Sequence, residues 1–156
     1  MLDITILTIG KLKSSACLEL ADDYFSRLKR MAKIKVIELP GGRFSEGQAK
    51  LSRQQDSQKV LEWLKNYPDS QVYLMAEQGQ EHNSLSWSSM MTKWDADGKK
   101  IILIIGGAAG LDPDILNKAI RLSLSGLTWP HEIARVLLLE QLYRGLMISG
   151  GKDYHY

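Results

Sequence analysis

The sequence predicts an α/β fold, with an open, mainly parallel sheet and helices on both of its faces. Two observations lead to this prediction. Short segments rich in Ile, Val and Leu alternate along the chain with longer segments whose apolar residues recur at helical spacing. The chain has 156 residues, 44% of them hydrophobic, which is enough for one domain with a sizeable core. We therefore expect a single domain over residues 1–156.

The N-terminal half is expected to contain two strands and two helices. Residues 2–9 (LDITILTI) and 34–39 (IKVIEL) are short and β-branched, and turn residues bound them, which favours strands. Between them, residues 15–31 repeat apolar side chains at helical spacing behind Ser14, a residue type that caps helix N-termini. Residues 48–66 place leucines on a largely polar helix.

The C-terminal half is expected to contain three strands, at residues 71–75, 100–105 and 121–125, which are short and bounded by turn residues. A helix over residues 85–96 separates the first two strands. It stops near Gly98, which suits the C-terminal cap of a helix.

Two further helices are expected near the end of the chain. Asp112 is a suitable N-cap and Pro113 suits the first turn, so a helix is predicted to begin there. The last helix, residues 130–148, is apolar around more of its circumference than one neighbouring layer would cover. In a chain of this size a second copy is the simplest partner, so we expect a homodimer joined through this helix.

Basic residues are unevenly distributed along the chain. The totals, 20 basic and 18 acidic residues, are nearly balanced, but residues 27–59 hold nine basic residues and three acidic ones. Such a local excess can attract RNA to one face of a protein. A solvated helix surface explains the same pattern, so the charge alone does not decide between them.

Several classes of protein are not expected. Cys17 is the only cysteine, which excludes an intrachain disulfide and suits a reducing cytosol. No apolar run approaches the roughly 18 residues that span a bilayer, so we expect a cytoplasmic protein without membrane association. The histidines and the cysteine have no metal-ligand spacing, and no metal is expected.

A glycine-rich turn, GGAAG at residues 106–110, follows the strand 100–105. In open α/β sheets ligands bind at the carboxyl ends of the strands, so this turn lies where a site would be. Its spacing fits neither G-x-G-x-x-G nor G-x-x-x-x-G-K-[ST], which argues against a nucleotide-phosphate site. A plain tight turn remains an alternative.

Two other turns leave expected strands, at residues 75–83 and 122–135. If the three turns approach one another, they can hold an uncharged adenine ring by main-chain hydrogen bonds. Met75, Leu124 and Leu127 would then form apolar walls. We therefore favour a nucleoside pocket.

Several motifs resemble those of the RlmH (YbeA) group of SPOUT RNA methyltransferases. They are IGGAAGL, LSLSGLTWPH, ARVLLLEQLYRG and the final YHY, and the opening ITILTIGKLK and IKVIELPGG also fit, so the resemblance covers the whole chain. Two places depart from the family pattern. Met75 and Ala76 stand where the family usually has Leu and an acidic residue, and Gly150 and Gly151 precede the terminal aromatic residues.

The resemblance implies a fold, a cofactor and a reaction. The fold would have a deep trefoil knot in its C-terminal part, with the knot and the cofactor pocket in about residues 70–156. S-adenosylmethionine would be the methyl donor, and a homodimer would build each site from two chains. The implied reaction is methylation of N3 of a pseudouridine in helix 69 of the large-subunit (23S) ribosomal RNA, on the assembled ribosome. The cofactor contacts implied are Met75, Gly106, Leu124, Ser125, Gly126, Leu127, Thr128 and Trp129.

Methyl transfer from a sulfonium requires the accepting nitrogen to lie in line and to lose its proton. Tyr154 and His155, in the tail, are the candidates for proton transfer, although an ordinary frayed terminus is the alternative. Arg135 and Arg144 lie on a mainly apolar helix, where each must meet a carboxylate or an RNA phosphate. Glu140, one turn before Arg144, is a plain structural partner.

Two alternatives to an enzyme of this kind remain open at this point. One is an RNA-binding module without catalytic activity, which would use the basic stretch at residues 27–59. The other is a different nucleotide-binding α/β protein, against which the glycine spacing argues. His131, in the first turn of the last helix, is expected to be neutral and to have a structural or pocket-lining role.

Overall fold

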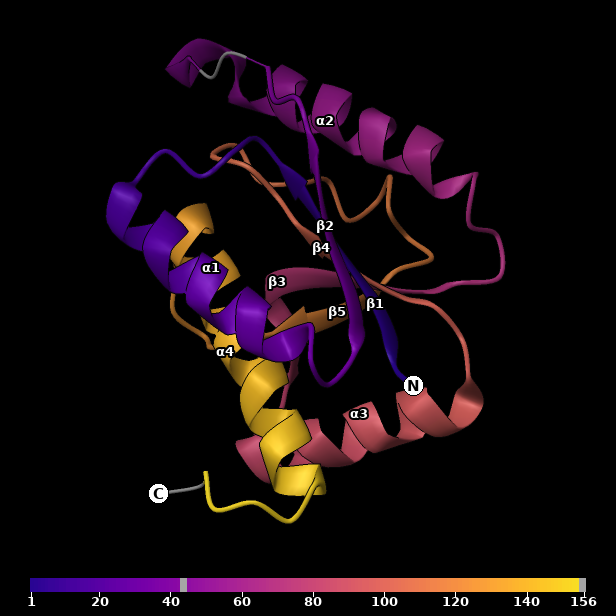
Figure 1. The fold of residues 1–156 in the computed structure, drawn as a ribbon. Coiled ribbons are helices and arrows are strands. Elements are labelled where there is room, and N and C mark those ends of the chain that lie inside the picture. The colour runs from indigo at the N-terminus through magenta and orange to yellow at the C-terminus, as the bar shows by residue number, and fades with distance from the viewer. Residues whose placement is uncertain (43–44, 155–156) are drawn as a thin grey trace.

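The computed structural model describes residues 1–42 and 45–154, without the side chain of Glu46. Within these residues five parallel strands form one sheet in the order β2-β1-β4-β3-β5 (Figure 1). The strands are β1 (Asp3–Ile9), β2 (Lys33–Leu39), β3 (Gln71–Glu81), β4 (Ile101–Ile105) and β5 (Ile120–Ser123). The helices are α1 (Ser15–Leu28), α2 (Ala49–Leu64), α3 (Ser84–Asp97) and α4 (His131–Ser149), and the short 3-10 helix η1 (Glu46–Gln48) precedes α2.

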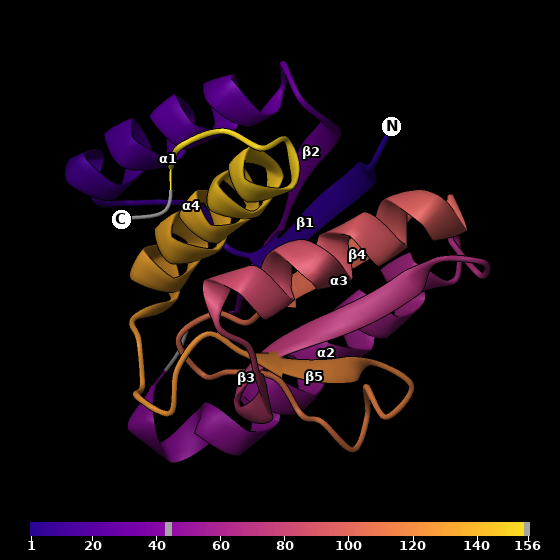
Figure 2. The ribbon, with the colours of Figure 1, turned by 90° about the horizontal axis from the view of Figure 1, so that it is seen from below.

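Helices cover both faces of the sheet, as predicted. In Figure 2, α3 and α4 lie in front of the sheet and α2 lies behind it. Side chains of α1, α3 and α4 form one core cluster with the strands, and α2 forms a second cluster with the opposite face. None of the helices in the described part of the chain is long and apolar enough to cross a membrane.

Strand β4 lies at the centre of this arrangement and is completely buried. Because successive side chains of a strand point to opposite faces, Ile101, Leu103 and Ile105 enter the first cluster, and Ile102 and Ile104 enter the second. The continuous apolar run of this strand is therefore explained by helices on both sides.

Most of the predicted elements are confirmed to within a few residues. The Ser14 hydroxyl accepts a hydrogen bond from the backbone N–H of Cys17 at the start of α1. Gly98 ends α3 with a φ of 64°, a left-handed conformation that favours glycine. Pro130 directly precedes α4.

The helix predicted to begin at Asp112 was wrong. The carbonyl of Asp112 accepts a hydrogen bond from Leu116, which closes one turn, and no helix follows before β5. Leu116 is buried in the second core cluster, and β5 begins only four residues later at Ile120. The chain therefore has room for one helical turn before it enters the sheet again.

Strand β3 does not end at Met75, so the turn expected over residues 75–83 also needs correction. Met75 and Gln80 both pair with Leu122 of β5, and the residues between them form an irregularity in the ladder. Gly79 lies here against β5: a Cβ atom on it would be 2.5 Å from the carbonyl carbon of Leu122. The strand therefore continues to Glu81 after a bulge, and a glycine permits the close approach of the two strands.

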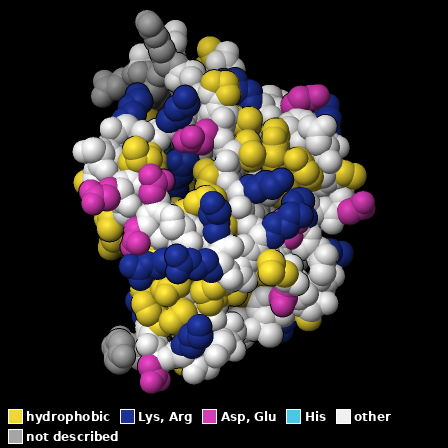
Figure 3. Space-filling view, in the orientation of Figure 1, with side chains coloured by type: hydrophobic (Ala, Val, Ile, Leu, Met, Phe, Trp, Pro, Cys, Tyr) yellow, Lys and Arg dark blue, Asp and Glu magenta, His cyan; other side chains and the backbone are white. Residues whose placement is uncertain are grey.

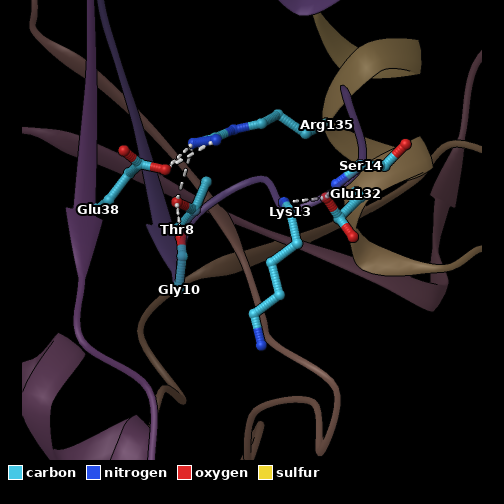
Figure 4. A network of polar contacts seen from close by, with 7 residues as sticks. All are labelled: Thr8, Gly10, Lys13, Ser14, Glu38, Glu132 and Arg135. Atoms are coloured by element: carbon cyan, nitrogen blue, oxygen red, sulfur yellow. Dashed lines mark hydrogen bonds and ion pairs between the residues drawn. The ribbon is translucent and has the colours of Figure 1, made fainter. Parts of the chain in front are cut away.

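Helix α4 is tied to the strand ends by two carboxylates (Figure 4). The guanidinium of Arg135 is buried and donates to Oε2 of Glu38 in β2 at 2.8 and 3.0 Å. Glu132 accepts hydrogen bonds from the backbone N–H groups of Lys13 and Ser14, ahead of α1. These two N–H groups lower the pKa of Glu132. The first turns of α4 are thus fixed to β2 and to the segment that follows β1.

Helix α4 is only partly covered within one chain. Its buried residues face the sheet, α1 and α3, while Ile133 is 40% exposed and the neighbouring Leu127 is 65% exposed. An incompletely covered apolar helix is what the expected homodimer requires, and the dimer stays a prediction.

Replacing Gly79 by alanine should destabilise the protein, because the added methyl group must displace the backbone of β5. We expect a loss of about 1–3 kcal/mol in the free energy of unfolding, measured by denaturant titration. Gly47→Ala is the matched control, since a Cβ atom at Gly47 has nothing within 4 Å. Equal stabilities of the two variants would contradict the close packing of β3 on β5.

The charge of Glu132 should make stability depend on pH. Its folded pKa is lowered, so its contribution is complete above the unfolded value of about 4.3 and is lost as the pH falls through the folded value. Glu132→Gln should therefore lower Tm by about 2–4 °C at pH 7 and by less below about pH 4. Thermal unfolding across this range tests it, with Glu62→Gln as an exposed control. If the difference in Tm between the wild type and Glu132→Gln does not change with pH, the charge of Glu132 does not stabilise the fold.

Candidate functional site

A cavity of about 970 Å³ lies at the carboxyl ends of the parallel strands. Its walls come from three segments that follow strands or interrupt them: residues 74–78 of β3, residues 105–111 after β4, and residues 124–131 between β5 and α4. These segments are far apart in the sequence, and the sheet brings them together. The expectation that three such segments approach one another is therefore confirmed. The volume is in the range of small-molecule sites, about 300–1,000 Å³.

The structure places most of the predicted cofactor contacts on this cavity. Those that line it are Met75, Gly106, Leu124, Ser125, Leu127, Thr128 and Trp129. Gly126 is not among the lining residues; a Cβ atom there would be 3.4 Å from Oε1 of Glu81. The lining therefore includes seven of the eight residues, and their contact with a cofactor stays a prediction.

The glycine turn is shaped by close backbone approaches. The backbone N–H of Gly110 donates to the carbonyl of Gly107 at 3.0 Å, and Gly110 has a φ of 72°. A Cβ atom on Gly106 would lie 3.1 Å from the backbone of Gly110, and one on Gly107 would lie 3.2 Å from Ile9. The segment is thus both a tight turn and a cavity wall, so the two interpretations of the sequence apply together.

Hydroxyl groups shape the turn that follows β5. Ser123 donates from its hydroxyl to the carbonyl of Ser125 at 2.8 Å, and the Ser125 hydroxyl accepts from the N–H of Leu127 at 3.0 Å. These short-range hydrogen bonds bend the backbone around the cavity. The serines of LSLSGLTWPH therefore serve the shape of the turn, whereas Leu127 leaves its side chain at the exposed rim.

Sequence reasoning missed the contribution of α2. Arg53 lines the cavity, and its Nε donates to the carbonyl of Ala109 at 3.1 Å. It lies outside residues 70–156, where the pocket was expected, and one arginine on a polar helix carries no local signal of such a role. Glu77 and Arg121 also line the cavity and were not predicted, whereas His131 lines it as expected.

Tyr154 and Arg144 lie at the other end of α4. The guanidinium of Arg144 donates to Oε1 of Glu140 at 2.7 and 2.9 Å, which confirms the structural pairing, and to the carbonyl of Tyr154 at 3.0 Å. Arg144 is ten residues beyond Ala134, which lines the cavity, so about 15 Å of helix separates them. His155 lies outside the described residues. Within one chain, Arg144 and Tyr154 therefore do not lie at the cavity.

Burial raises the pKa of the Tyr154 phenol to about 12, and its hydrogen bond with Tyr24 adds to the rise. The Tyr154 ring packs edge-on against Tyr143, with the ring centroids 5.0 Å apart, and lies 4.8 Å from the guanidinium carbon of Arg144. In this position the phenol is protonated at neutral pH and can donate a hydrogen bond. Its part in proton transfer stays a prediction.

Arg135 meets a carboxylate, which is one of its two expected partners. Besides its bonds to Glu38 it lies 3.4 Å from the Thr8 hydroxyl, and burial lowers the pKa of its guanidinium. A small cavity of about 10 Å³ beside it is also lined by Gly106 and His131, which belong to the main cavity. Arg135 thus lies behind the wall of the main cavity, and its catalytic role stays a prediction.

Two other observations bear on the choice of site. A larger but shallower hollow of about 1,160 Å³ lies beside α2 near the end of β2, away from the converging strand ends, and the segments after β4 and β5 contribute only Ile115 to it. Among residues 1–42 and 45–154, no group of three or more His, Cys, Asp or Glu side chains is arranged to hold a metal ion.

Comparisons with known proteins agree with this geometry. A family model described as "Predicted SPOUT methyltransferase" matches residues 2–155. Proteins named "Ribosomal RNA large subunit methyltransferase H" are 36% identical in Pelotomaculum thermopropionicum, over 100% of both chains, and 34% identical in Clostridium novyi, over 99% of both.

Solved structures share the fold at low sequence identity. A probable methylase family protein from Haemophilus influenzae Rd KW20 has a TM-score of 0.57 at 15% identity, covering 100% of this chain and 72% of that one. The TrmH/SpoU tRNA modifying enzyme of A. aeolicus has a TM-score of 0.52 at 13% identity, covering 97% and 78%. Together with the family model, which covers nearly the whole sequence, these findings show that the chain belongs to the SPOUT methyltransferase family.

Proposed function

We propose that this protein is an S-adenosylmethionine-dependent methyltransferase of large-subunit ribosomal RNA. The observation that carries the proposal is the cavity at the strand ends, formed by three backbone segments in a SPOUT methyltransferase. Relatives that match the whole chain are named as large-subunit ribosomal RNA methyltransferases, which supports this class of substrate. The cavity and the family together favour this function over an RNA-binding module without catalytic activity.

The residues of the cavity fit the proposed methyl donor. Gly106 and Gly107 let the turn pack tightly, because side chains on them would collide with Gly110 and Ile9. The backbone of this turn lines the cavity, where its polar groups could meet a purine ring. Met75 and Leu124 supply apolar walls, and residues 124–129 would hold the nucleoside through their backbone. When bound, S-adenosylmethionine supplies an activated methyl group. The protein then has to orient the RNA base and to direct its proton away.

The proposed acceptor is N3 of a pseudouridine in helix 69 of 23S ribosomal RNA, presented by the assembled ribosome in the cytoplasm. Charge near the cavity supports an RNA substrate, since Arg53 and Arg121 are exposed and line it. Figure 3 shows Lys and Arg side chains across the middle of one face, with Asp and Glu mainly toward its edges. The basic stretch at residues 27–59 would provide the RNA-facing surface.

We also propose that each site contains the tail of a second copy. Within one chain the first turn of α4 lines the cavity, and Tyr154 lies beyond the far end of this helix. If two α4 helices pack antiparallel through their exposed apolar sides, the tail of each copy reaches the cavity of the other. His155 would then accept the proton, with Tyr154 as a hydrogen-bond donor and Arg144 holding the tail backbone.

The rest of the proposal follows from the resemblance to the RlmH group. The whole chain would form one domain, and residues of about 70–156 would contain a deep trefoil knot beside the cofactor. Arg135, which is bound to Glu38 behind the cavity wall, would act by holding α4 in place.

Methyl transfer to ribosomes tests the activity. With radiolabelled S-adenosylmethionine, we expect label to enter the 23S RNA of ribosomes from a strain that lacks this gene, and no label to enter ribosomes that are already modified. Unmodified naked RNA serves as a comparison of substrates. Absence of transfer to the unmodified ribosomes, with a folded protein that binds the donor, would contradict the proposed function.

Mixing two inactive variants tests the composite site. Thr128→Trp fills the cavity from an exposed position, and His155→Ala removes the proposed proton acceptor while leaving donor affinity nearly unchanged. Each variant should lose about a hundredfold or more in transfer rate. After subunit exchange, a mixed dimer would regain one intact site, so activity should return to a substantial fraction of wild type. No recovery in mixed dimers would place the tail and the cavity of a working site on the same chain.

A further inference from the structure

Helix α2 holds the glycine turn through two polar side chains. The hydroxyl of Ser57 accepts a hydrogen bond from the backbone N–H of Asp112 at 2.7 Å, and it donates to the carbonyl of Arg53 at 2.7 Å. One turn earlier, Nε of Arg53 donates to the carbonyl of Ala109 at 3.1 Å. Ser57 and Arg53 therefore hold this segment by hydrogen bonds to the backbone at Asp112 and Ala109, which are three residues apart. Both side chains come from a helix in the other half of the chain.

These two hydrogen bonds are important because the segment between β4 and β5 has little regular secondary structure to fix its conformation. Its own backbone hydrogen bonds close isolated turns, at Gly110, Leu116 and Ala119, and no helix forms within it. The same segment supplies residues 106–111 of the cavity wall. The conformation of residues 106–111 therefore depends on contacts with residues outside the segment.

We propose that Ser57 and Arg53 are positioning residues, which fix the glycine turn in the conformation that binds the methyl donor. This inference rests on the proposed function. A ligand that binds to a flexible turn must order it, and the lost conformational entropy reduces the affinity. When the turn is already fixed in the free protein, this entropy is not lost on binding. The two residues belong to a part of the chain to which neither the resemblance nor the comparisons assign a role in the site.

Ser57 separates this role from direct contact with the ligand. Its side chain is completely buried and it does not line the cavity, so it can influence a bound molecule only through the turn. Arg53 does line the cavity and has further N–H donors on its guanidinium, so its replacement can also remove a direct contact. The decisive variant is therefore Ser57→Ala.

The experiment compares Ser57→Ala with Ser52→Ala. Both serines are buried on α2, but Ser52 makes none of the hydrogen bonds described for the turn, so the control removes the same atom from the same helix. Calorimetry with S-adenosylhomocysteine, the demethylated product, should give a Kd about three- to tenfold higher for Ser57→Ala and unchanged for Ser52→Ala. The KM for the donor should rise by a similar factor, while kcat stays within about twofold.

Arg53 provides a second pair of variants on the helix surface. Arg53→Ala should raise the Kd, and Arg53→Lys should restore part of the affinity because an ammonium group can also donate to the carbonyl of Ala109. Lys50→Ala, another exposed cation of α2, is the matched control. If Ser57→Ala fails to fold, amide exchange of residues 107–111 in Arg53→Ala, compared with Lys50→Ala, decides whether α2 acts on the turn, because exchange measured without ligand does not depend on a direct contact.

Amide hydrogen exchange measures the turn without any ligand. The amide of Asp112, which loses its acceptor, and the amides of residues 107–111 should exchange faster in Ser57→Ala than in Ser52→Ala. Equal exchange and equal Kd in the two variants would overturn the inference, as would a loss of kcat with an unchanged KM. If the wild-type protein itself failed to bind S-adenosylhomocysteine, the proposed function would fail instead, and the exchange rates would still decide whether α2 fixes the turn.

Discussion

The parallel pairing of β4 between β1 and β3 is the constraint on which the cavity depends. Parallel strands end at one edge of a sheet, so the segments that follow them meet whatever their distance in the sequence. The register of β4 is defined on both sides, because Ile101 pairs with Ile4 of β1 and with Gln71 of β3, and Ile104 pairs with Leu7 and Leu74. Gly106 follows this strand directly and thereby receives a defined position. The packing of the core therefore determines where the wall of the cavity lies.

Much of this arrangement could be predicted from local patterns. The apolar run of β4, the cap at Ser14 and the glycine at the end of α3 all act within a few residues of where they stand. The lining residues in the segment after β5 came from motif resemblance combined with their place after a strand. The lining of the cavity could be predicted where a residue and its structural context are neighbours in the sequence, while the contacts of these residues with a cofactor stay a prediction.

The failures share a different cause. Asp112 and Pro113 have the side chains of a helix start, but the buried Leu116 and the start of β5 four residues later leave room for only one turn, and tertiary packing overrides the local signal. The extension of β3 beyond Met75 depends on pairing with a strand more than forty residues later. The role of Arg53 depends on a carbonyl at position 109, a partner that no pattern within α2 indicates. The pairing of Arg144 with Glu140 could be predicted, because the two residues are only four positions apart on one helix.

The position of β5 has a consequence for how the protein is made. This strand is at the edge of the sheet, pairs with β3 alone, and is reached only after the chain has passed across one face of the sheet. During synthesis the first four strands leave the ribosome before it, with one side of β3 still unpaired. A nascent chain that ends before β5 therefore lacks the cavity wall at residues 124–131 and also the leucines that α4 adds to the first core cluster. Both are completed only as the last third of the chain emerges. Premature termination in this region would yield a core with an open strand edge, a form that is prone to self-association.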